Sequence, residues 1–132
     1  MNLCRQQGIP VDRDGWNGGK RYICRDGHEA RSLYEQRVDN WLTEHGLIHK
    51  TEPRYPFDTR YKADFLVRDT YIEVWGVTNN PAYRERKAKK IHFCLANGLQ
   101  LIQINHWQFA KGRRWWRPLE RLLIEDDAAK LF

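Results

Sequence analysis

The chain has 132 residues, of which 41% are hydrophobic and 30% are charged. This length suits one globular domain rather than two, and the composition excludes a disordered chain. The net charge of +6 at pH 7 favours a polyanionic partner, and nucleic acid is the commonest such partner of a soluble protein. A positive charge of this size also serves solubility alone, so it indicates a class of partner without identifying one.

No apolar run approaches the roughly 20 residues needed to cross a bilayer, so no membrane partner is expected. The first residues, MNLCRQQGIPVDRDG, lack the apolar core of a signal peptide. The three cysteines have no disulfide-framework spacing, and they favour a reduced, intracellular setting. They are Cys4, Cys24 and Cys94.

Residues 1–27 contain several glycines and a proline with no sustained periodicity, which predicts an irregular N-terminal arm ahead of a domain spanning residues 28–132. Basic residues alternate there with Trp16 and Tyr22, a pattern typical of a segment lying along a nucleic-acid backbone. The basic residues of this arm expected to contact DNA are Arg13, Lys20, Arg21 and Arg25.

Cys4, Cys24 and His28 raise the question of a zinc site in the arm. A structural zinc site needs four ligands, usually in paired knuckles, and no CxxC pair accompanies these residues. Zinc is therefore not expected.

The segment from His28 to His45 predicts a helix, because apolar residues recur at helical spacing and Gly46 follows as a C-terminal glycine should. Glu35 flanks the apolar stripe, so it can face either solvent or a site. At i, i+4 spacing it can also form an ion pair with Arg31, worth only tenths of a kcal/mol. The expected inward stripe is Tyr34, Val38, Trp41, Leu42 and His45.

A strand is predicted over residues 47–52, and residues 61–67 and 71–77 predict a hairpin, since both are rich in aromatic and β-branched residues around a short polar break. Side chains two apart share a face of a strand. Asp64 and Glu73 are therefore expected to converge, with Phe65, Val67, Ile72 and Val74 on the opposite face. Two carboxylates on a mostly apolar hairpin need a partner, and a divalent cation is the natural one.

Asn79-Asn80-Pro81 predicts a helix start, and the helix should end near Ala96. Ala88, Ile91 and Leu95 are expected to form its apolar stripe, and Tyr83, Lys87 and Lys90 line an adjacent stripe. The run LQLIQIN over residues 99–105 predicts a buried strand beside the hairpin.

The C-terminal part combines aromatic residues with a second basic cluster and then predicts a helix over residues 119–131. The pattern suits a surface that stacks on bases and contacts phosphates, although aromatics at this density also form cores or dimer interfaces. The aromatics are Trp107, Phe109, Trp115 and Trp116, and the basic residues expected to contact DNA are Lys111, Arg113, Arg114 and Arg117.

The stretch YKADFLVRDTYIEVWG, with the helix and strand that follow it, resembles the PD-(D/E)xK nuclease superfamily over residues 31–104. Asp64 matches the family Asp, and Glu73-Val74-Trp75 matches the (D/E)xK triplet. Ala63 stands at the position of the Pro and Trp75 at that of the Lys. Some branches of the superfamily carry the lysine on the following helix, after a segment similar to IEVWG.

The resemblance implies an α/β, restriction-endonuclease-like fold, with an αβββαβ core, a mixed sheet flanked by helices, an N-terminal arm and a C-terminal helix. It also implies that Asp64, Glu73 and Glu35 bind Mg²⁺, for which Mn²⁺ can substitute. The missing lysine would come from Lys90 or Lys87, and Lys90 matches better when counted back from the helix end. Lys62, two residues before Asp64 on the same strand face, is a local candidate.

The activity implied is a Mg²⁺-dependent endodeoxyribonuclease acting on double-stranded DNA, of the homing type in the first place. A Holliday junction resolvase and a restriction or nicking endonuclease are the close alternatives, and many relatives act as homodimers. The tryptophan at the lysine position leaves a second hypothesis, a non-catalytic DNA-binding module on the same fold. An RNA-processing nuclease is a third.

Overall fold

The computed structural model describes residues 21–57, 60–76 and 79–126. Its centre is a four-stranded mixed sheet in which β5 pairs antiparallel with β4 and parallel with β6. The sheet order is β3 (Lys50–Thr51), β4 (Phe65–Val67), β5 (Thr70–Trp75) and β6 (Gln100–Asn105).

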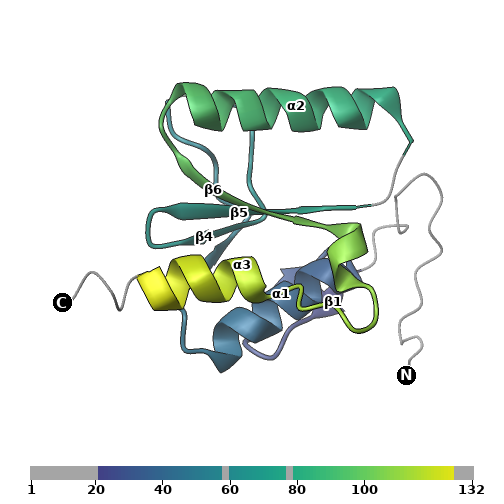
Figure 1. Ribbon diagram of the computed structural model, residues 1–132, viewed down its shortest axis with the longest axis vertical. Helices are drawn as coiled ribbons and strands as arrows, with labels where there is room; N and C mark the ends of the chain where they lie inside the picture. Colours follow the sequence, from purple (N-terminus) through teal and green to yellow (C-terminus); the bar gives the residue numbers. More distant parts are fainter. Residues whose placement is uncertain (1–20, 58–59, 77–78, 127–132) are drawn as a thin grey trace.

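Helices cover both faces of this sheet: α2 (Pro81–Ala96) lies over one face, and α1 (Leu33–Glu44) and α3 (Arg117–Leu119) lie over the other (Figure 1). The order α1, β3, β4, β5, α2, β6 is the expected αβββαβ order, so the predicted α/β fold class is confirmed. No helix in the described part of the chain is long and apolar enough to span a membrane.

The central hairpin forms where the sequence predicts it, with Phe65 opposite Ile72 and a turn at Arg68, whose φ is 56°. The first strand is shorter than the expected 61–67, because the chain bends at Asp64 and leaves the regular ladder there. Phe65, Val67, Ile72 and Val74 all belong to the main hydrophobic core, as predicted. Both faces of β5 are buried, as expected for a strand between two helical layers.

Helix α1 begins at Leu33, with the Ser32 side chain accepting a hydrogen bond from the Glu35 N–H. The expected start at His28 is wrong, because residues 22–30 form a short hairpin of β1 (Tyr22–Ile23) and β2 (Glu29–Ala30) that packs on α1. The expected boundary between residues 27 and 28 falls inside this hairpin. The arm predicted over residues 1–27 stays a prediction, and its first 20 residues lie outside the described residues.

Helix α2 matches the predicted bounds, with Asn80 as N-cap and Pro81 in the first turn. Its predicted apolar stripe is wrong, because Ala88 is exposed and the Leu95 residue is 77% exposed. The side chains turned toward the sheet come instead from the neighbouring stripe, which consists of Tyr83, Lys87, Lys90 and Cys94. Helix α2 therefore presents lysines, and not an aliphatic ridge, to the sheet.

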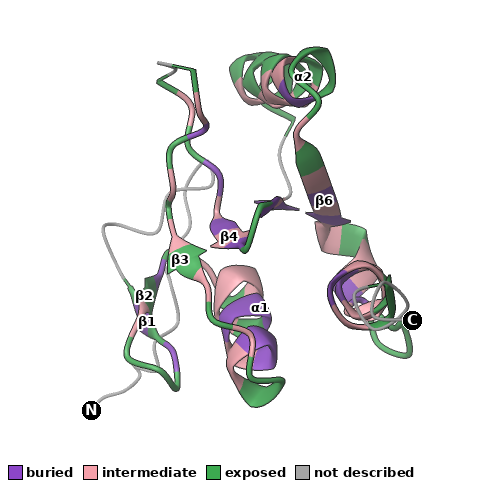
Figure 2. Cartoon of the chain, turned by 90° about the vertical axis from the view of Figure 1, so that its left-hand side faces the viewer, coloured by how far each residue is buried: buried purple, intermediate pink, exposed green. Residues whose placement is uncertain are grey.

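The C-terminal region closes the core on the α1 side (Figure 2). After η1 (His106–Phe109), α3 continues into the π-helical segment η2 (Glu120–Glu125), and Leu119 and Leu123 are buried. The predicted helix starts two residues late, and its far end, including Leu131, lies outside the described residues. The aromatics divide between the two expected roles, since Phe109 and Trp115 are core and Trp107 is 51% exposed.

Candidate active site

Asp64 sits at the bend just before β4, where the chain diverges from β5 while still pairing with the segment that follows β3. Its backbone N–H donates to the Ile72 carbonyl at 3.1 Å, and its Oδ2 accepts from the Val74 N–H at 2.6 Å. The Asp64 carboxylate thus accepts from a β5 N–H in place of a backbone carbonyl of the segment before β4, which diverges from β5 at this point. This fixes Asp64 against the strand that carries Glu73.

Glu73 lies in the middle of β5 and is 1% exposed, which is rare for a carboxylate without partners. The Tyr55 hydroxyl donates to Glu73 Oε2 at 2.8 Å, and Lys90 Nζ lies 3.3 Å from the same oxygen. Tyr55 precedes the hairpin and Lys90 comes from α2, so segments from three parts of the chain meet at this carboxylate.

Glu35 lies in the first turn of α1. The Arg31 N–H donates to Glu35 Oε1 at 3.5 Å, whereas the Arg31 guanidinium lies 3.8 Å from a Glu52 carboxylate oxygen. The ion pair of Glu35 with Arg31, which the sequence spacing allows, is therefore only part of the environment of Glu35. The charge of Asp64 also acts on Glu35, which places the two carboxylates in one electrostatic group.

Asp64 is the centre of that group. Burial, followed by the charge of Asp64, raises the pKa of Glu35 to about 8 and that of Glu73 to about 7. Burial also raises the pKa of Asp64 itself. Three carboxyl groups in this arrangement resist ionising together, because each negative charge is poorly solvated and repels its neighbours. A cation placed among them would relieve that repulsion.

Lys90 reaches this group and Lys87 goes elsewhere. Lys90 Nζ also donates to the backbone carbonyl of Lys62 at 2.7 Å, which holds the ammonium beside Glu73. Lys87 donates to Asn105 Oδ1 at 3.1 Å, at the end of β6. The Trp75 ring lies beneath both, 5.1 Å from Lys87 Nζ and 5.7 Å from Lys90 Nζ. The Trp75 ring thus supports the lysines that arrive from α2.

Two tyrosines lie in this region that are not among the predicted site residues. Tyr55 contacts Glu73, and the Tyr83 hydroxyl accepts from the Gly76 N–H at 2.9 Å where β5 ends. Tyr83 was placed on the same stripe as Lys87 and Lys90, so its location follows from helical spacing. Tyr55 lies in a connection without periodicity, and no sequence pattern indicated its contact with Glu73.

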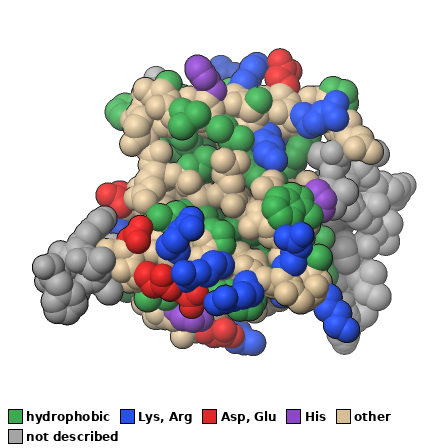
Figure 3. All heavy atoms as spheres, viewed as in Figure 1, with side chains coloured by type: hydrophobic (Ala, Val, Ile, Leu, Met, Phe, Trp, Pro, Cys, Tyr) green, Lys and Arg blue, Asp and Glu red, His purple; other side chains and the backbone are tan. Residues whose placement is uncertain are grey.

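The residues predicted to contact DNA are spread over two regions. On the face of the molecule seen in Figure 3, Lys and Arg side chains are mixed with Asp and Glu side chains where α3 lies. Arg113 is exposed and stacks over the Trp107 ring at 5.1 Å, whereas Arg117 pairs with Glu120 at 2.9 Å and also with Glu125. The other residues predicted to contact DNA that the structure describes are exposed, and one of them, Arg25, also pairs with Glu44. They are Arg21, Arg25, Lys111 and Arg114, while Arg13 and Lys20 lie outside the described residues.

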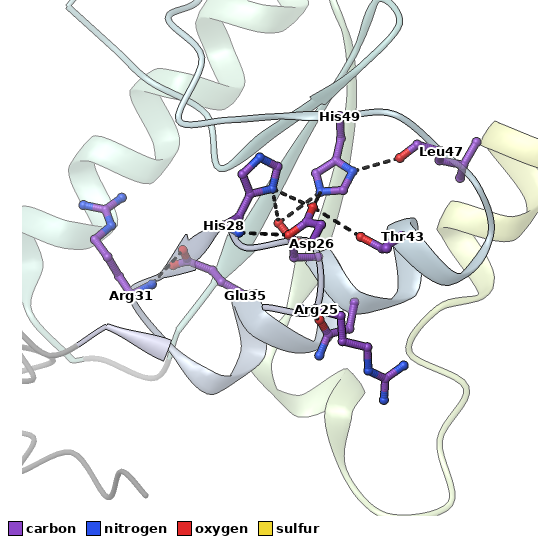
Figure 4. Close-up of polar contacts among 10 residues, drawn as sticks. Arg25, Asp26, His28, Arg31, Glu35, Thr43, Leu47 and His49 are labelled. Atoms are coloured by element: carbon purple, nitrogen blue, oxygen red, sulfur yellow. Dashed lines mark hydrogen bonds and ion pairs between the residues drawn. The ribbon is translucent and has the colours of Figure 1, made fainter. Parts of the chain in front are cut away.

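A second polar cluster lies beside α1, and the sequence did not indicate it as a unit. Asp26, His28, Asp39 and His49 each offer an atom within 4.8 Å of the others, and Figure 4 shows the labelled members converging. It is the one group of three or more such residues, among those the structure describes, that is close enough to hold a metal ion. Cys24, which was considered as a zinc ligand together with Cys4 and His28, is a buried thiol outside this group of four.

Comparison with known proteins gives one structural similarity. No family model matches the chain, and no curated protein is similar to it. Among solved structures, the chain resembles the catalytic domain of homing endonuclease I-Bth0305I, at 19% identity and a TM-score of 0.40, over 76% of this chain and 90% of that one. At this level of similarity, the chemistry of the site has to be inferred from its own side chains.

Proposed function

We propose that this chain is a metal-dependent nuclease of the PD-(D/E)xK type, with its lysine supplied by α2. The observation that carries the proposal is the approach of Lys90 Nζ to within 3.3 Å of Glu73 Oε2. A half-buried Asp and a buried Glu on one hairpin with a lysine beside them are the residue types that phosphodiester hydrolysis requires.

The oxygen donors of Asp64 and Glu73 suit a divalent cation, although Asp64, Glu73 and Glu35 do not lie close enough together in the described structure to form a ligand group of three as they stand. Asp64 and Glu73 would hold the cation, and Glu35 is the third carboxylate of the same electrostatic group. Such carboxylates suit Mg²⁺, for which Mn²⁺ is a substitute. When bound, this ion lowers the pKa of an attacking water and neutralises charge on the phosphate.

The side chains of the site have separate roles beyond binding the ion. Lys90 is a fixed positive charge, since its ammonium also donates to the Lys62 carbonyl, and it can stabilise the negative charge that grows on the phosphoryl oxygens. Tyr55 orients Glu73 by donating to Oε2. Asp64 is oriented by the Val74 N–H. Side chains held in this way need little rearrangement when substrate binds.

Double-stranded DNA is the proposed substrate, because the net charge is positive and basic residues flank the domain at both ends. Within the class, a site-specific endonuclease of the homing type is our first choice for a small domain with basic extensions, acting as a homodimer if it cuts both strands. A Holliday junction resolvase would prefer branched DNA. A nicking or restriction enzyme would prefer a linear or supercoiled duplex.

One observation favours a second function, a DNA-binding module that has lost its chemistry. The residue at the family's lysine position is Trp75, which can supply neither a charge nor a proton. If Lys90 serves only to neutralise Glu73, the site would bind DNA without cutting it.

The test is incubation of the full chain with supercoiled plasmid and with a four-way DNA junction, in Mg²⁺ and in EDTA, beside Asp64→Ala. We expect cleavage in Mg²⁺ alone, none by the variant, and DNA binding by both proteins. Binding without cleavage by the wild-type chain would support the DNA-binding module. Equal cleavage by Asp64→Ala would contradict the proposed site.

A further inference from the structure

We propose that Asp26, His28, Asp39 and His49 form a structural metal site, separate from the proposed active site and suited to Zn²⁺. The four residues come from three segments. Asp26 and His28 belong to the turn between β1 and β2, Asp39 to α1, and His49 to the connection before β3. A bound ion would tie these segments together.

The four ligating atoms surround a common point. His28 Nδ1 lies 2.7 Å from Asp26 Oδ2 and 3.0 Å from Asp39 Oδ2. His49 Nε2 lies 3.2 Å and 3.0 Å from the same two oxygens. Ligands at zinc-bond lengths of about 2.0–2.1 Å around a tetrahedral centre would be ~3.3 Å apart. A small outward adjustment of these side chains would therefore accommodate the ion.

The orientation of His49 points to a cation at the centre. Its Nδ1 is 2.8 Å from the Leu47 carbonyl, and since a carbonyl only accepts, this nitrogen carries the proton. In the neutral ring, Nε2 then presents a lone pair to two carboxylate oxygens. Metal-binding histidines characteristically donate their second nitrogen to a carbonyl in this way, which fixes the tautomer.

Two buried atoms of the cluster have no hydrogen-bond partner among the described residues. They are His49 Nε2 and Asp39 Oδ1, on side chains that are 4% and 1% exposed. His49 Nε2 lies close to both carboxylates, yet a proton placed on it would point well at neither oxygen. In a purely ionic cluster, a protonated His49 would hold this nitrogen by ion pairs without a well-directed hydrogen bond, whereas a metal ion would bind its lone pair directly.

The neighbours of the cluster hold its ligands in place. Asp26 Oδ1 accepts from the His28 N–H at 3.0 Å, and Thr43 Oγ1 donates to Asp26 Oδ2 at 3.3 Å. Contacts of this kind keep a metal-binding carboxylate in one orientation.

The ligand types select the ion. Mg²⁺ prefers oxygen ligands and keeps several waters, whereas imidazole suits Zn²⁺ and its first-row neighbours. Two imidazoles and two carboxylates complete a four-coordinate shell, with no position left for a substrate, as in a structural zinc site. The expectation against zinc concerned Cys4, Cys24 and His28, and this ligand set shares only His28 with it.

The experiment measures metal binding and stability in the full chain, not cleavage. After treatment with EDTA and gel filtration, the chain is titrated with Zn²⁺ and, separately, with Co²⁺, whose visible absorption reports tetrahedral coordination. We expect one equivalent of each to bind. We also expect a melting temperature about 5–10 °C higher at Zn²⁺ concentrations 100-fold above Kd.

The variants are Asp39→Asn, His49→Gln and the half-exposed His28→Gln, with His45→Gln as the matched control because His45 bonds only within α1. Each ligand variant should weaken Zn²⁺ binding more than ~100-fold, because even the loss of a residue that only orients a ligand lowers metal affinity about 10–100-fold. If Asp39→Asn or His49→Gln does not fold, His28→Gln decides the question. Unchanged Zn²⁺ affinity in the folded ligand variants, or no zinc binding by the wild-type chain, would overturn the proposal. Glu73→Gln should retain the zinc, so failure of the proposed nuclease site leaves this result standing.

Discussion

Helix α1 contributes one carboxylate to each of two polar clusters, and the two clusters differ in what they are built to hold. Glu35, in the first turn, belongs to the group around Asp64, whereas Asp39, one turn later, faces His28 and His49. The first group offers oxygen ligands with a lysine beside them, and the second offers two imidazoles in a closed shell. The comparison teaches that two positions one turn apart on a helix can contribute to clusters with different ligand types, which suit different metal ions.

The largest effect should come from breaking the first cluster while sparing the second. Glu73→Gln removes one negative oxygen ligand and keeps the side-chain shape. Loss of a metal ion's contribution of ~4 kcal/mol to the transition state corresponds to a fall in cleavage rate on the order of 10³-fold. Single-turnover cleavage of plasmid measures the rate, and zinc content measured on the same samples should be unchanged.

The matched variant for that prediction is His49→Gln, assayed with saturating Mg²⁺ well below its melting temperature. We expect its cleavage rate to stay within about 10-fold of the wild-type rate, because the proposed zinc has no position for substrate. If His49→Gln were as inactive as Glu73→Gln while still folded, the division into a catalytic and a structural cluster would be wrong.

The next effect concerns the lysines. Lys90→Ala should lower the cleavage rate about 10²–10³-fold at saturating DNA, because it removes a fixed positive charge beside Glu73. Lys87→Ala removes a contact with Asn105 and should cost far less. Lys89→Ala is the control, since Lys89 is exposed and pairs with Glu85 on the outer surface of α2. Equal, modest losses in all three variants would show that no lysine of α2 acts in the cleavage step.

Stability should depend on pH through the first cluster. The pKa of Glu73 is raised to about 7, with burial as the main cause, so folding favours its protonated form. The stabilisation is full below the unfolded pKa of 4.5 and is lost as pH rises through about 7. In EDTA, the wild-type chain should therefore lose roughly 2 kcal/mol between about pH 5 and pH 8.5 through this group.

Denaturant unfolding of wild-type and Glu73→Gln proteins at the two pH values measures this loss. The variant stays neutral throughout and should lose less stability, while titrating groups outside the cluster around Asp64 contribute equally to both proteins. Added Mg²⁺ should reduce the wild-type loss at high pH, because it binds the ionised carboxylates. An identical pH dependence in the two proteins would mean that Glu73 titrates at an ordinary pKa in the folded chain.

The smallest effects belong to the basic surface. Affinity for duplex DNA should fall steeply with salt, by a logarithmic slope of about 0.9 for each phosphate contacted. Arg113→Ala should reduce this slope by about 1. Arg117→Ala should change it less, because Arg117 is already paired with Glu120 and Glu125. Fluorescence anisotropy across a salt series measures the DNA affinity of the wild-type chain and of the two variants. A DNA affinity that does not change with salt would argue against phosphate contacts.

Local sequence patterns predicted the meeting of Asp64 and Glu73, whereas Glu35 was assigned to the first cluster, and Lys90 preferred over Lys87, only through the family resemblance. Two strands with alternating faces brought Asp64 and Glu73 together, and helical spacing placed Lys90 on the stripe that meets them. The bend at Asp64, which gives its carboxylate to the Val74 N–H, had no such signal. The apolar stripe of α2 was misplaced because the lysines, with their long aliphatic stems, occupy the face turned to the sheet.

The second cluster escaped prediction because its ligands are spread over three segments with no CxxC spacing. Two signals were present in the sequence. Asp39 lies next to Val38, on the buried side of α1, and a charged residue there needs a partner. Ser32 followed three residues later by Glu35 is a pattern that marks a helix start at Ser32, and a helix starting there leaves His28 outside it.

The central claim is that the carboxylates around Asp64 hold the divalent ion with which this chain cuts DNA. Its most direct test is Mn²⁺ binding to the zinc-loaded chain, followed by the loss of the free-ion EPR signal, with Glu73→Gln and the control Lys89→Ala. We expect at least one Mn²⁺ to bind to the wild-type and Lys89→Ala proteins, and the affinity of Glu73→Gln to fall at least ~10-fold. Equal Mn²⁺ affinity in Glu73→Gln and the wild-type chain would contradict the claim.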